Sequence, residues 1–172
     1  MEQSEKKEFP HGEGTRIVHP ISPVYDENSR ILILGSFPSV KSREENFFYG
    51  HPQNRFWRVL AALYGENVPS TTEKKCAFLH AHGIALYDVI ASCEISGSAD
   101  ASIRKVSPTD LSPLLSCGKI GRIYVNGKTA ESYYQKYQQA QTGIRATLLP
   151  STSPANAAYS FERLIDAWKI IL

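Results

Sequence analysis

The feature that most constrains the fold is a short aliphatic run, Ile31 to Leu34, which Gly35 follows directly. Every side chain in the run is apolar, so hydrophobicity does not alternate from one residue to the next. A strand with this pattern is buried on both faces, as in the centre of a parallel sheet covered by helices. Ligands bind such sheets beyond the carboxyl ends of the strands. The segment after Leu34 is therefore the first place to look for a site.

Further apolar runs alternate with helical patterns along the chain. We expect strands at four ranges: 30–34, 84–90, 120–125 and 144–149. We expect helices over 56–64, behind a capping box formed by Ser70 and Glu73, over 111–116 with Asp110 as cap, over 129–139, and at the C-terminus. This alternation predicts a single α/β domain with a short, mostly parallel four-stranded sheet. The domain is expected over 16–172, and the charged residues 1–15 are expected to form a flexible tail.

Composition bounds the function only loosely. The chain has 172 residues and a net charge of +2, which suits one folded domain and neither demands nor excludes nucleic acid. Five basic residues are compatible with a DNA-binding patch or with an ordinary solvated surface: Arg55, Arg58, Arg104, Lys105 and Lys128. The 3 cysteines form no Cys-x-x-Cys pair, so we expect neither metal nor cofactor. The sequence shows no signal peptide or membrane span, and we expect a cytoplasmic protein with reduced thiols.

Three segments that follow predicted strands open at the same edge of the predicted sheet. They are Gly35 to Ser39, Asn126 to Lys128 and Pro150 to Asn156. Small residues let the backbone approach a ligand closely. Any one of these segments alone reads as an ordinary turn. Together with the polar and aromatic loop over 46–57, they predict a binding site.

The residues taken singly leave alternatives open. Asn54 fits a helix cap as well as a catalytic amide, and the usual role of His51 is a structural hydrogen bond. Asp88 lies within an apolar strand, so we expect it to be paired or capping if it is buried. Of the three consecutive aromatic residues over 47–49, at least one should line a surface or pocket. The chain has no nucleophile elbow, phosphate-loop lysine or dinucleotide fingerprint.

Four motifs in this order resemble the uracil-DNA glycosylase superfamily and, within it, the hypoxanthine-DNA (deoxyinosine) glycosylase family. They are Gly35-Ser36-Phe37-Pro38-Ser39, His51-Pro52-Gln53-Asn54-Arg55-Phe56-Trp57, Asn126-Gly127-Lys128, and Leu149-Pro150-Ser151-Thr152-Ser153-Pro154-Ala155-Asn156. The resemblance runs from His19 to the last helix. It implies a three-layer α/β/α sandwich, a DNA partner containing deaminated bases, and hydrolysis of the N-glycosidic bond of a flipped nucleotide.

The resemblance also assigns roles to residues. Mismatch-specific uracil glycosylases carry a water-positioning Asn where this chain has Phe37, and the deoxyinosine family relies instead on an Asn that matches Asn54. Catalysis is therefore assigned to Asn54, and Phe37 or Tyr49 would stack on the base. Leu149 stands where many uracil enzymes have His or Asn, which places hypoxanthine ahead of uracil as substrate. The position of the wedge residue falls at about Ser153, and a polar wedge suggests weaker penetration of the duplex.

Two sets of site residues follow from the resemblance. The base pocket is expected to contain Gly35, Ser36, Phe37, Pro38, Ser39, Tyr49, His51 and Asn126. The DNA backbone is expected to contact Lys128, Ser151, Thr152, Ser153 and Asn156.

Other functions remain open at this stage. We expect a monofunctional glycosylase, because no lysine stands out as an imine-forming nucleophile. We also expect a monomer, because base excision needs only one copy of the chain. The missing amide at Phe37 keeps a non-catalytic binder of damaged DNA or nucleotides as the alternative. A small-molecule hydrolase that uses Ser36 or Ser39 is a weaker one, since the motif places no His base near either serine.

Overall fold

A computed structural model describes residues 15–172 of the chain, and the tail expected over 1–15 lies outside this range apart from its last residue. The strands are β1 (Arg16–Val18), β2 (Ile31–Gly35), β3 (Ile84–Asp88), β4 (Ile90–Glu94), β5 (Arg104–Pro108), β6 (Arg122–Asn126) and β7 (Thr147–Leu149). The α-helices are α1 (Val40–Glu45), α2 (Phe56–Tyr64), α3 (Thr72–Ala81), α4 (Ser112–Cys117), α5 (Lys128–Tyr137), α6 (Gln139–Thr142) and α7 (Phe161–Trp168). Two 3-10 turns lie at Asp100–Ser102 and Lys169–Ile171.

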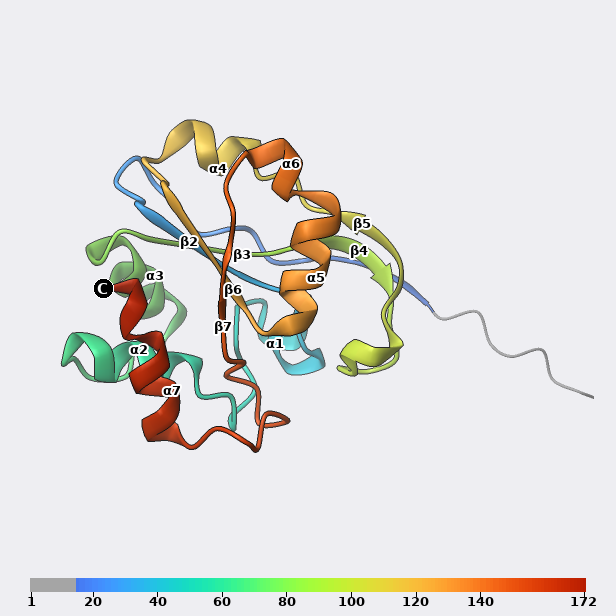
Figure 1. Cartoon of the computed structure of the whole chain (residues 1–172). Coiled ribbons are helices and arrows are strands. Elements are labelled where there is room, and N and C mark those ends of the chain that lie inside the picture. Colours follow the sequence, from blue (N-terminus) through green and yellow to red (C-terminus); the bar gives the residue numbers. More distant parts are fainter. Residues whose placement is uncertain (1–14) are drawn as a thin grey trace, which may run out of the picture.

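The main sheet has the strand order β3-β2-β6-β7, and every pair in it is parallel (Figure 1). All five residues of β2 are buried, as the continuous aliphatic run predicts. The predicted four-stranded parallel sheet is therefore confirmed. The last strand is shorter than expected, since β7 covers only Thr147–Leu149 of the predicted range 144–149.

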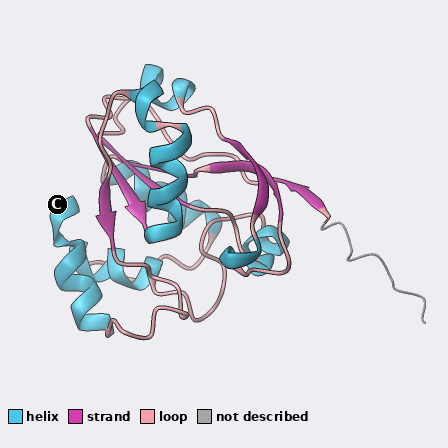
Figure 2. Ribbon diagram, turned by 45° about the vertical axis from the view of Figure 1, so that its right-hand side comes forward, coloured by secondary structure: helices cyan, strands magenta, loops and turns pink. Residues whose placement is uncertain are grey.

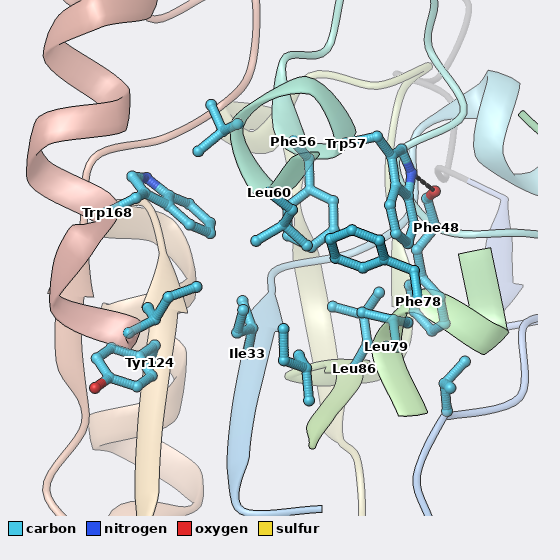
Figure 3. Packing of buried hydrophobic residues seen from close by; sticks show 14 of the residues in the cluster. Ile33, Phe48, Phe56, Trp57, Leu60, Phe78, Leu79, Leu86, Tyr124 and Trp168 are labelled. Atoms are coloured by element: carbon cyan, nitrogen blue, oxygen red, sulfur yellow. Dashed lines mark hydrogen bonds between the residues drawn. The ribbon is translucent and has the colours of Figure 1, made fainter. Parts of the chain in front are cut away.

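Helices cover both faces of this sheet, which confirms the three-layer sandwich (Figure 2). Because side chains alternate along a strand, Ile31 and Ile33 of β2 join one apolar cluster and Leu32 and Leu34 join the other. The first cluster packs α2, α3 and α7 against the sheet, and Trp168 lies among its largest buried side chains (Figure 3). The second cluster packs α4 and α5 against the opposite face.

A second, antiparallel sheet of order β1-β4-β5 was not predicted. The expected strand over 84–90 ends at Asp88, and the chain starts β4 at Ile90, inside a segment that the sequence places partly in a polar loop. The pairing of β4 with β5 contains register shifts, which disrupt the regular alternation by which a strand is recognised. Val24 bridges Leu86 on the outer edge of β3.

Local capping also differs from the predictions. Thr71, not Ser70, caps α3, because the Thr71 hydroxyl accepts the hydrogen bond from Lys74 N–H. Asp110 accepts a hydrogen bond from the N–H of Ser112, the first residue of α4, but Leu111 is the cap residue. Helix α1 lies where no helix is predicted, and Ser39 caps it.

The topology places a crevice at the carboxyl ends of β2 and β6. The chain leaves β2 toward α2 and α3 on one face, whereas it leaves the neighbouring strand β6 toward α5 on the other face. Adjacent parallel strands whose connections diverge in this way leave an opening between the loops, and ligands bind there.

Candidate active site

A cavity of about 400 Å³ lies at this crevice. Its walls come from the ends of β2, β3 and β6 and from the loops that follow β2, β4 and β7. The lining residues are Gly35, Ser36, Phe37, Pro38, Ser39, Ser42, Phe48, Tyr49, His51, Asn54, Asp88, Ser98, Ala99, Asp100, Asn126, Ser151, Thr152, Ser153, Pro154 and Ala155. We call Gly35, Tyr49 and Asp88 the floor of the pocket, and residues 96–100 and 150–156 its rim. The three predicted turn segments therefore meet at one cavity.

The floor is crowded around Gly35, which ends β2. A Cβ atom at this position would lie 2.5 Å from Asp88 Oδ1 and 3.0 Å from the Tyr49 hydroxyl oxygen. Real Cβ atoms do not approach other atoms so closely, so only glycine lets both polar groups lie over the end of the strand.

Asp88 is buried and paired, as expected for a carboxylate in an apolar strand. Its Oδ2 lies 2.7 Å from His19 Nε2, and the aspartate residue is 4% exposed. The other ring nitrogen, His19 Nδ1, accepts a hydrogen bond from Ile21 N–H at 3.1 Å. An acceptor at Nδ1 means that the proton of the neutral ring is on Nε2, so His19 donates to Asp88.

The Tyr49 hydroxyl is buried and, among the described residues, has no hydrogen-bond partner. Its ring stacks on Phe56 at a centroid distance of 3.9 Å, and the residue has a positive φ of 54°. Burial, together with the nearby charge of Asp88, raises the pKa of the Tyr49 hydroxyl well above its ordinary value. The hydroxyl therefore keeps its proton and can donate it to a hydrogen bond.

Asn54 lines the cavity immediately before α2. Its Oδ1 accepts a hydrogen bond from Phe56 N–H at 2.9 Å, so the expected capping contact exists, while Arg55 is the formal cap residue. This bond engages the oxygen end of the amide. The Nδ2 end is then the natural donor toward a ligand in the cavity.

The loop after β2 forms a further wall. Ser36 Oγ donates to Asp100 Oδ1 at 3.3 Å, and Arg43 lies 5.8 Å from the centre of the buried Phe37 ring. Burial raises the pKa of the Asp100 carboxyl, and hydrogen bonds from Ser36 and Thr129 partly oppose this rise. The sequence predicts Ser36 and Phe37 in this wall but gives no reason to place Asp100 beside them.

Asn126 holds the rim rather than facing the cavity freely. Its Nδ2 donates to Thr152 Oγ1 at 3.0 Å, and Thr152 N–H donates to its Oδ1 at 3.1 Å. Thr152 has no exposed surface, although it lines the cavity. Thr152, which the sequence predicts to contact a DNA phosphate, is thus bonded to Asn126 through both its hydroxyl and its N–H.

The rest of the 150–156 segment is also internally bonded. Ser151 Oγ accepts from Ser153 N–H, and Asn156 Nδ2 donates to the Ser151 carbonyl. The guanidinium of Arg55 donates to three carbonyls of this region, those of Ser153, Asn156 and Tyr159. Arg55 is therefore an internal clamp of the rim, and not part of an exposed basic patch.

Most predicted site residues meet at this cavity. All eight base-pocket residues and Asn54 line it, as do Ser151, Thr152 and Ser153. Lys128 and Asn156 do not line it; Lys128 is exposed at the start of α5. Leu149 is 1% exposed within the first apolar cluster, so its side chain belongs to the core.

Sequence reasoning missed the residues that face the predicted ones. Asp88 was read as structural, although a carboxylate in an apolar strand was the available signal. Ser98, Ala99 and Asp100 lie in a small-residue loop without a recognisable motif.

Within residues 15–172, no group of His, Cys, Asp and Glu side chains could hold a metal ion. No helix in the same range is long and apolar enough to span a membrane.

Comparison with known proteins gives one family. The model of the uracil DNA glycosylase superfamily matches residues 22–171. A protein of Methanosarcina acetivorans named hypoxanthine DNA glycosylase is 37% identical over 142 residues, which cover 81% of this chain and 89% of that protein. A protein of the same name from Methanosarcina barkeri is 34% identical over 136 residues, covering 78% of this chain and 85% of the relative.

A solved structure agrees with these relatives. The solution NMR structure of a protein described as a candidate uracil DNA glycosylase, from Methanosarcina acetivorans, superposes with a TM-score of 0.76. It is 34% identical in sequence and covers 90% of this chain and 96% of its own. The chain described here belongs to the uracil DNA glycosylase superfamily.

Proposed function

We propose that this protein is a monofunctional DNA glycosylase that hydrolyses the N-glycosidic bond of deoxyinosine and releases hypoxanthine, with uracil as a weaker substrate. The observation that carries the proposal is the cavity at the strand ends, which Asn54 lines beside the family's first motif. Family membership supports glycosylase chemistry, and the names of the two Methanosarcina relatives support hypoxanthine as the base.

The cavity suits a base that has left the double helix. The glycosidic bond is hidden in a stacked duplex, so an enzyme that acts on it extrudes the nucleotide into a pocket. The pocket is lined by both apolar rings and polar groups, and Phe37, Phe48 and Tyr49 all contribute to it. Aromatic rings offer stacking surfaces for the extruded base, and a dry cavity strengthens every hydrogen bond made inside it.

Asn54 acts in this proposal as a donor to the departing base. When the glycosidic bond breaks, the electron pair stays on the base and the sugar becomes cationic. Water then adds to the sugar carbon and releases a proton, and the departing base takes up a proton. An amide N–H aimed at the base strengthens as this negative charge develops, which lowers the barrier. The capping contact with Phe56 N–H fixes the orientation of the Asn54 amide in advance. Phe37 occupies the place of the usual amide, so the burden of catalysis falls on Asn54.

The base preference follows from two other positions. Leu149 is buried in the core, so the place from which many relatives stabilise a uracil anion holds no polar group. A purine can instead be protonated at its imidazole ring, which reduces the need for that group.

DNA backbone contacts are assigned to Lys128 and to the rim residues Ser151, Ser153 and Asn156. Because one copy of the chain supplies the lining of the cavity, we also propose that the enzyme acts as a monomer.

The proposal is tested with labelled duplexes that contain hypoxanthine, uracil or xanthine, followed by alkaline cleavage of abasic sites. We expect strand breaks at hypoxanthine first, and Asn54→Ala should lower the single-turnover rate by roughly 100- to 1000-fold. Gln53→Ala, the change of the neighbouring amide, is the matched control and should keep the rate. A wild-type protein that cuts none of the duplexes would favour the non-catalytic binder. Full activity of Asn54→Ala would remove only the assignment of Asn54.

A further inference from the structure

The floor of the cavity contains hydrogen-bonding capacity that the protein itself does not use. The Tyr49 hydroxyl is buried without a partner among the described residues. Asp88 receives the hydrogen bond of His19 on Oδ2, whereas Oδ1 is the oxygen that faces Gly35. The Asn126 amide bonds Thr152 through Oδ1 and through one N–H of Nδ2, and its second N–H lies close to the Tyr49 oxygen. Asn126 can therefore act on Tyr49 only as a donor, which leaves the Tyr49 proton without an acceptor. A buried polar group without a partner costs free energy, so it points to a ligand group that completes it.

The two groups have opposite hydrogen-bonding character. Asp88 Oδ1 is an acceptor, because His19 already supplies a donor to Oδ2 and is held in that tautomer by Ile21 N–H. Tyr49 is a donor, because burial and the charge of Asp88 keep its hydroxyl protonated by raising its pKa. The floor therefore presents one acceptor and one donor.

The donor and the acceptor also lie side by side. Both groups lie within 3.0 Å of the same point, the place where a Cβ on Gly35 would be. Both residues line the cavity. A ligand that reaches the end of β2 would meet the two groups together and would need an adjacent donor and acceptor of its own.

Deamination creates such an edge on a base. It converts an exocyclic amino group into a carbonyl oxygen and turns the neighbouring ring nitrogen from an acceptor into an N–H donor. We propose that Asp88 and Tyr49 read this lactam edge, with Asp88 Oδ1 accepting from the ring N–H and the Tyr49 hydroxyl donating to the carbonyl oxygen. The inference rests on the proposed function and adds to it the atoms by which the substrate is recognised.

The same pair rejects the undamaged parent base. Adenine presents a ring nitrogen lone pair to the Asp88 oxygen, which repels it, and an amino group that cannot accept the Tyr49 proton. A site built to bond one polar edge discriminates strongly because the wrong edge leaves its groups unpaired. Cytosine is rejected in the same way relative to uracil. Guanine and thymine carry a lactam edge of their own, so their rejection depends on contacts at other ring positions.

The test measures equilibrium binding to duplexes whose target nucleotide carries a 2′-fluoro group that blocks hydrolysis. One duplex contains hypoxanthine, and the other contains unsubstituted purine, which lacks the N–H and the carbonyl. For each protein the ratio of the two dissociation constants is taken, so that effects on general DNA binding cancel. We expect wild type to prefer hypoxanthine. Tyr49→Phe should reduce the ratio by roughly tenfold and Asp88→Asn by roughly 10- to 100-fold.

Both variants keep the shape of the side chain. Asn at position 88 can hold His19 with its oxygen and then turns an NH₂ donor toward the cavity, which opposes the ring N–H. Tyr49→Phe removes a hydroxyl that has no partner, so its melting temperature should not fall. Matched controls are Tyr133→Phe on α5 and Asp166→Asn on α7, which lie outside the cavity lining and should keep the wild-type ratio.

The outcomes separate this inference from the proposed function. Equal binding of the two duplexes by wild type, or an unchanged ratio in folded Tyr49→Phe, would overturn the lactam contact even if wild type releases hypoxanthine. A ratio that falls in the variants of a protein that cleaves no duplex would support the contact and remove the enzyme. If Asp88→Asn does not fold, Tyr49→Phe decides the question alone.

Discussion

The floor and the rim of the same cavity treat their polar groups in opposite ways. On the floor, the Tyr49 hydroxyl is buried without a partner among the described residues, and Asp88 offers an oxygen beyond the one that His19 holds. On the rim, Ser151 and Asn156 are bonded within their own segment. The floor thus offers unused hydrogen-bonding groups to a ligand, whereas the polar groups of the rim bond to one another and fix its conformation.

This difference suggests that the floor reads the base and that the rim contacts the DNA backbone. Two floor residues, Gly35 and Asp88, end the strands β2 and β3, and Tyr49 lies on a loop that Phe56 supports by stacking. A base read by buried groups needs such support. The rim follows β4 and β7 and faces outward, so it suits contact with the DNA backbone, where shape and hydrogen-bond donors matter more than base identity.

The largest expected effect comes from filling the space that the floor needs. Gly35→Ala would place a methyl group 2.5 Å from Asp88 Oδ1, so that the carboxylate must leave its position. We expect the free energy of unfolding to fall by about 1–3 kcal/mol through overpacking, and hypoxanthine release to slow by roughly 100-fold. Urea unfolding and single-turnover kinetics measure the two effects.

Gly121→Ala is the matched control for this change. A Cβ at Gly121 meets no atom within 4 Å, so neither stability nor rate should fall. If Gly35→Ala kept full activity, the floor could not be the place where the base is read. The contrast between the floor and the rim would then lose its functional meaning.

A smaller effect is expected from loosening the rim. Arg55→Met removes the guanidinium that holds the carbonyls of Ser153, Asn156 and Tyr159. The free energy of unfolding should fall by about 2 kcal/mol, because hydrogen bonds from a charged donor are among the stronger ones. Binding to undamaged duplex should weaken, while the preference for hypoxanthine over purine should stay.

Arg58→Met provides the control for the rim. Arg58 lies on α2 and is exposed, and its guanidinium carbon is 5.9 Å from the centre of the Phe161 ring. Hydrogen exchange at residues 151–159 should speed up in Arg55→Met and not in Arg58→Met. A loss of base preference in Arg55→Met would show that the rim also reads the base, and the division between rim and floor would have to be redrawn.

The sequence predicts the strand ends well because burial on both faces leaves a plain signal. The aliphatic run of β2 and the turn beginning at Gly35 locate the cavity, and Asn126 and Ser151 follow from the same reasoning about parallel strands. The antiparallel sheet escapes prediction because β1 has only three residues and β5 pairs through register shifts. Short, irregular strands carry almost no periodicity.

The partners of the site residues could not be predicted, because they are distant along the chain. His19 and Asp88 are 69 positions apart, and Arg55 reaches a carbonyl 98 positions away at Ser153. A sequence shows that a buried carboxylate needs a partner, but not which partner it has. Arg55 therefore reads as surface charge in the sequence and serves as an internal clamp in the fold.

The smallest effect concerns Asp100, the rim residue that most resembles the floor. Although the residue as a whole is exposed, burial raises the pKa of its carboxyl group beside Ser36. Below the ordinary pKa of 3.8 both folded and unfolded states hold the proton. As the pH rises, the unfolded chain ionises first, so this carboxyl makes the fold less stable up to the raised pKa and beyond.

Asp100→Asn removes this titration and can still accept the hydrogen bond from Ser36. Its free energy of unfolding should exceed that of wild type at pH 7, and the gap should close toward pH 3. Asp110→Asn gives the opposite sign, because the hydrogen bond from Ser112 N–H lowers the pKa of Asp110 and its charge favours the fold above the ordinary pKa. Thermal unfolding from pH 3 to pH 8 compares the three proteins. A gap that closes at low pH would show that the cost of Asp100 to stability is the cost of its charge. A gap of equal size at every pH would show that the effect comes from the changed side chain and not from its charge.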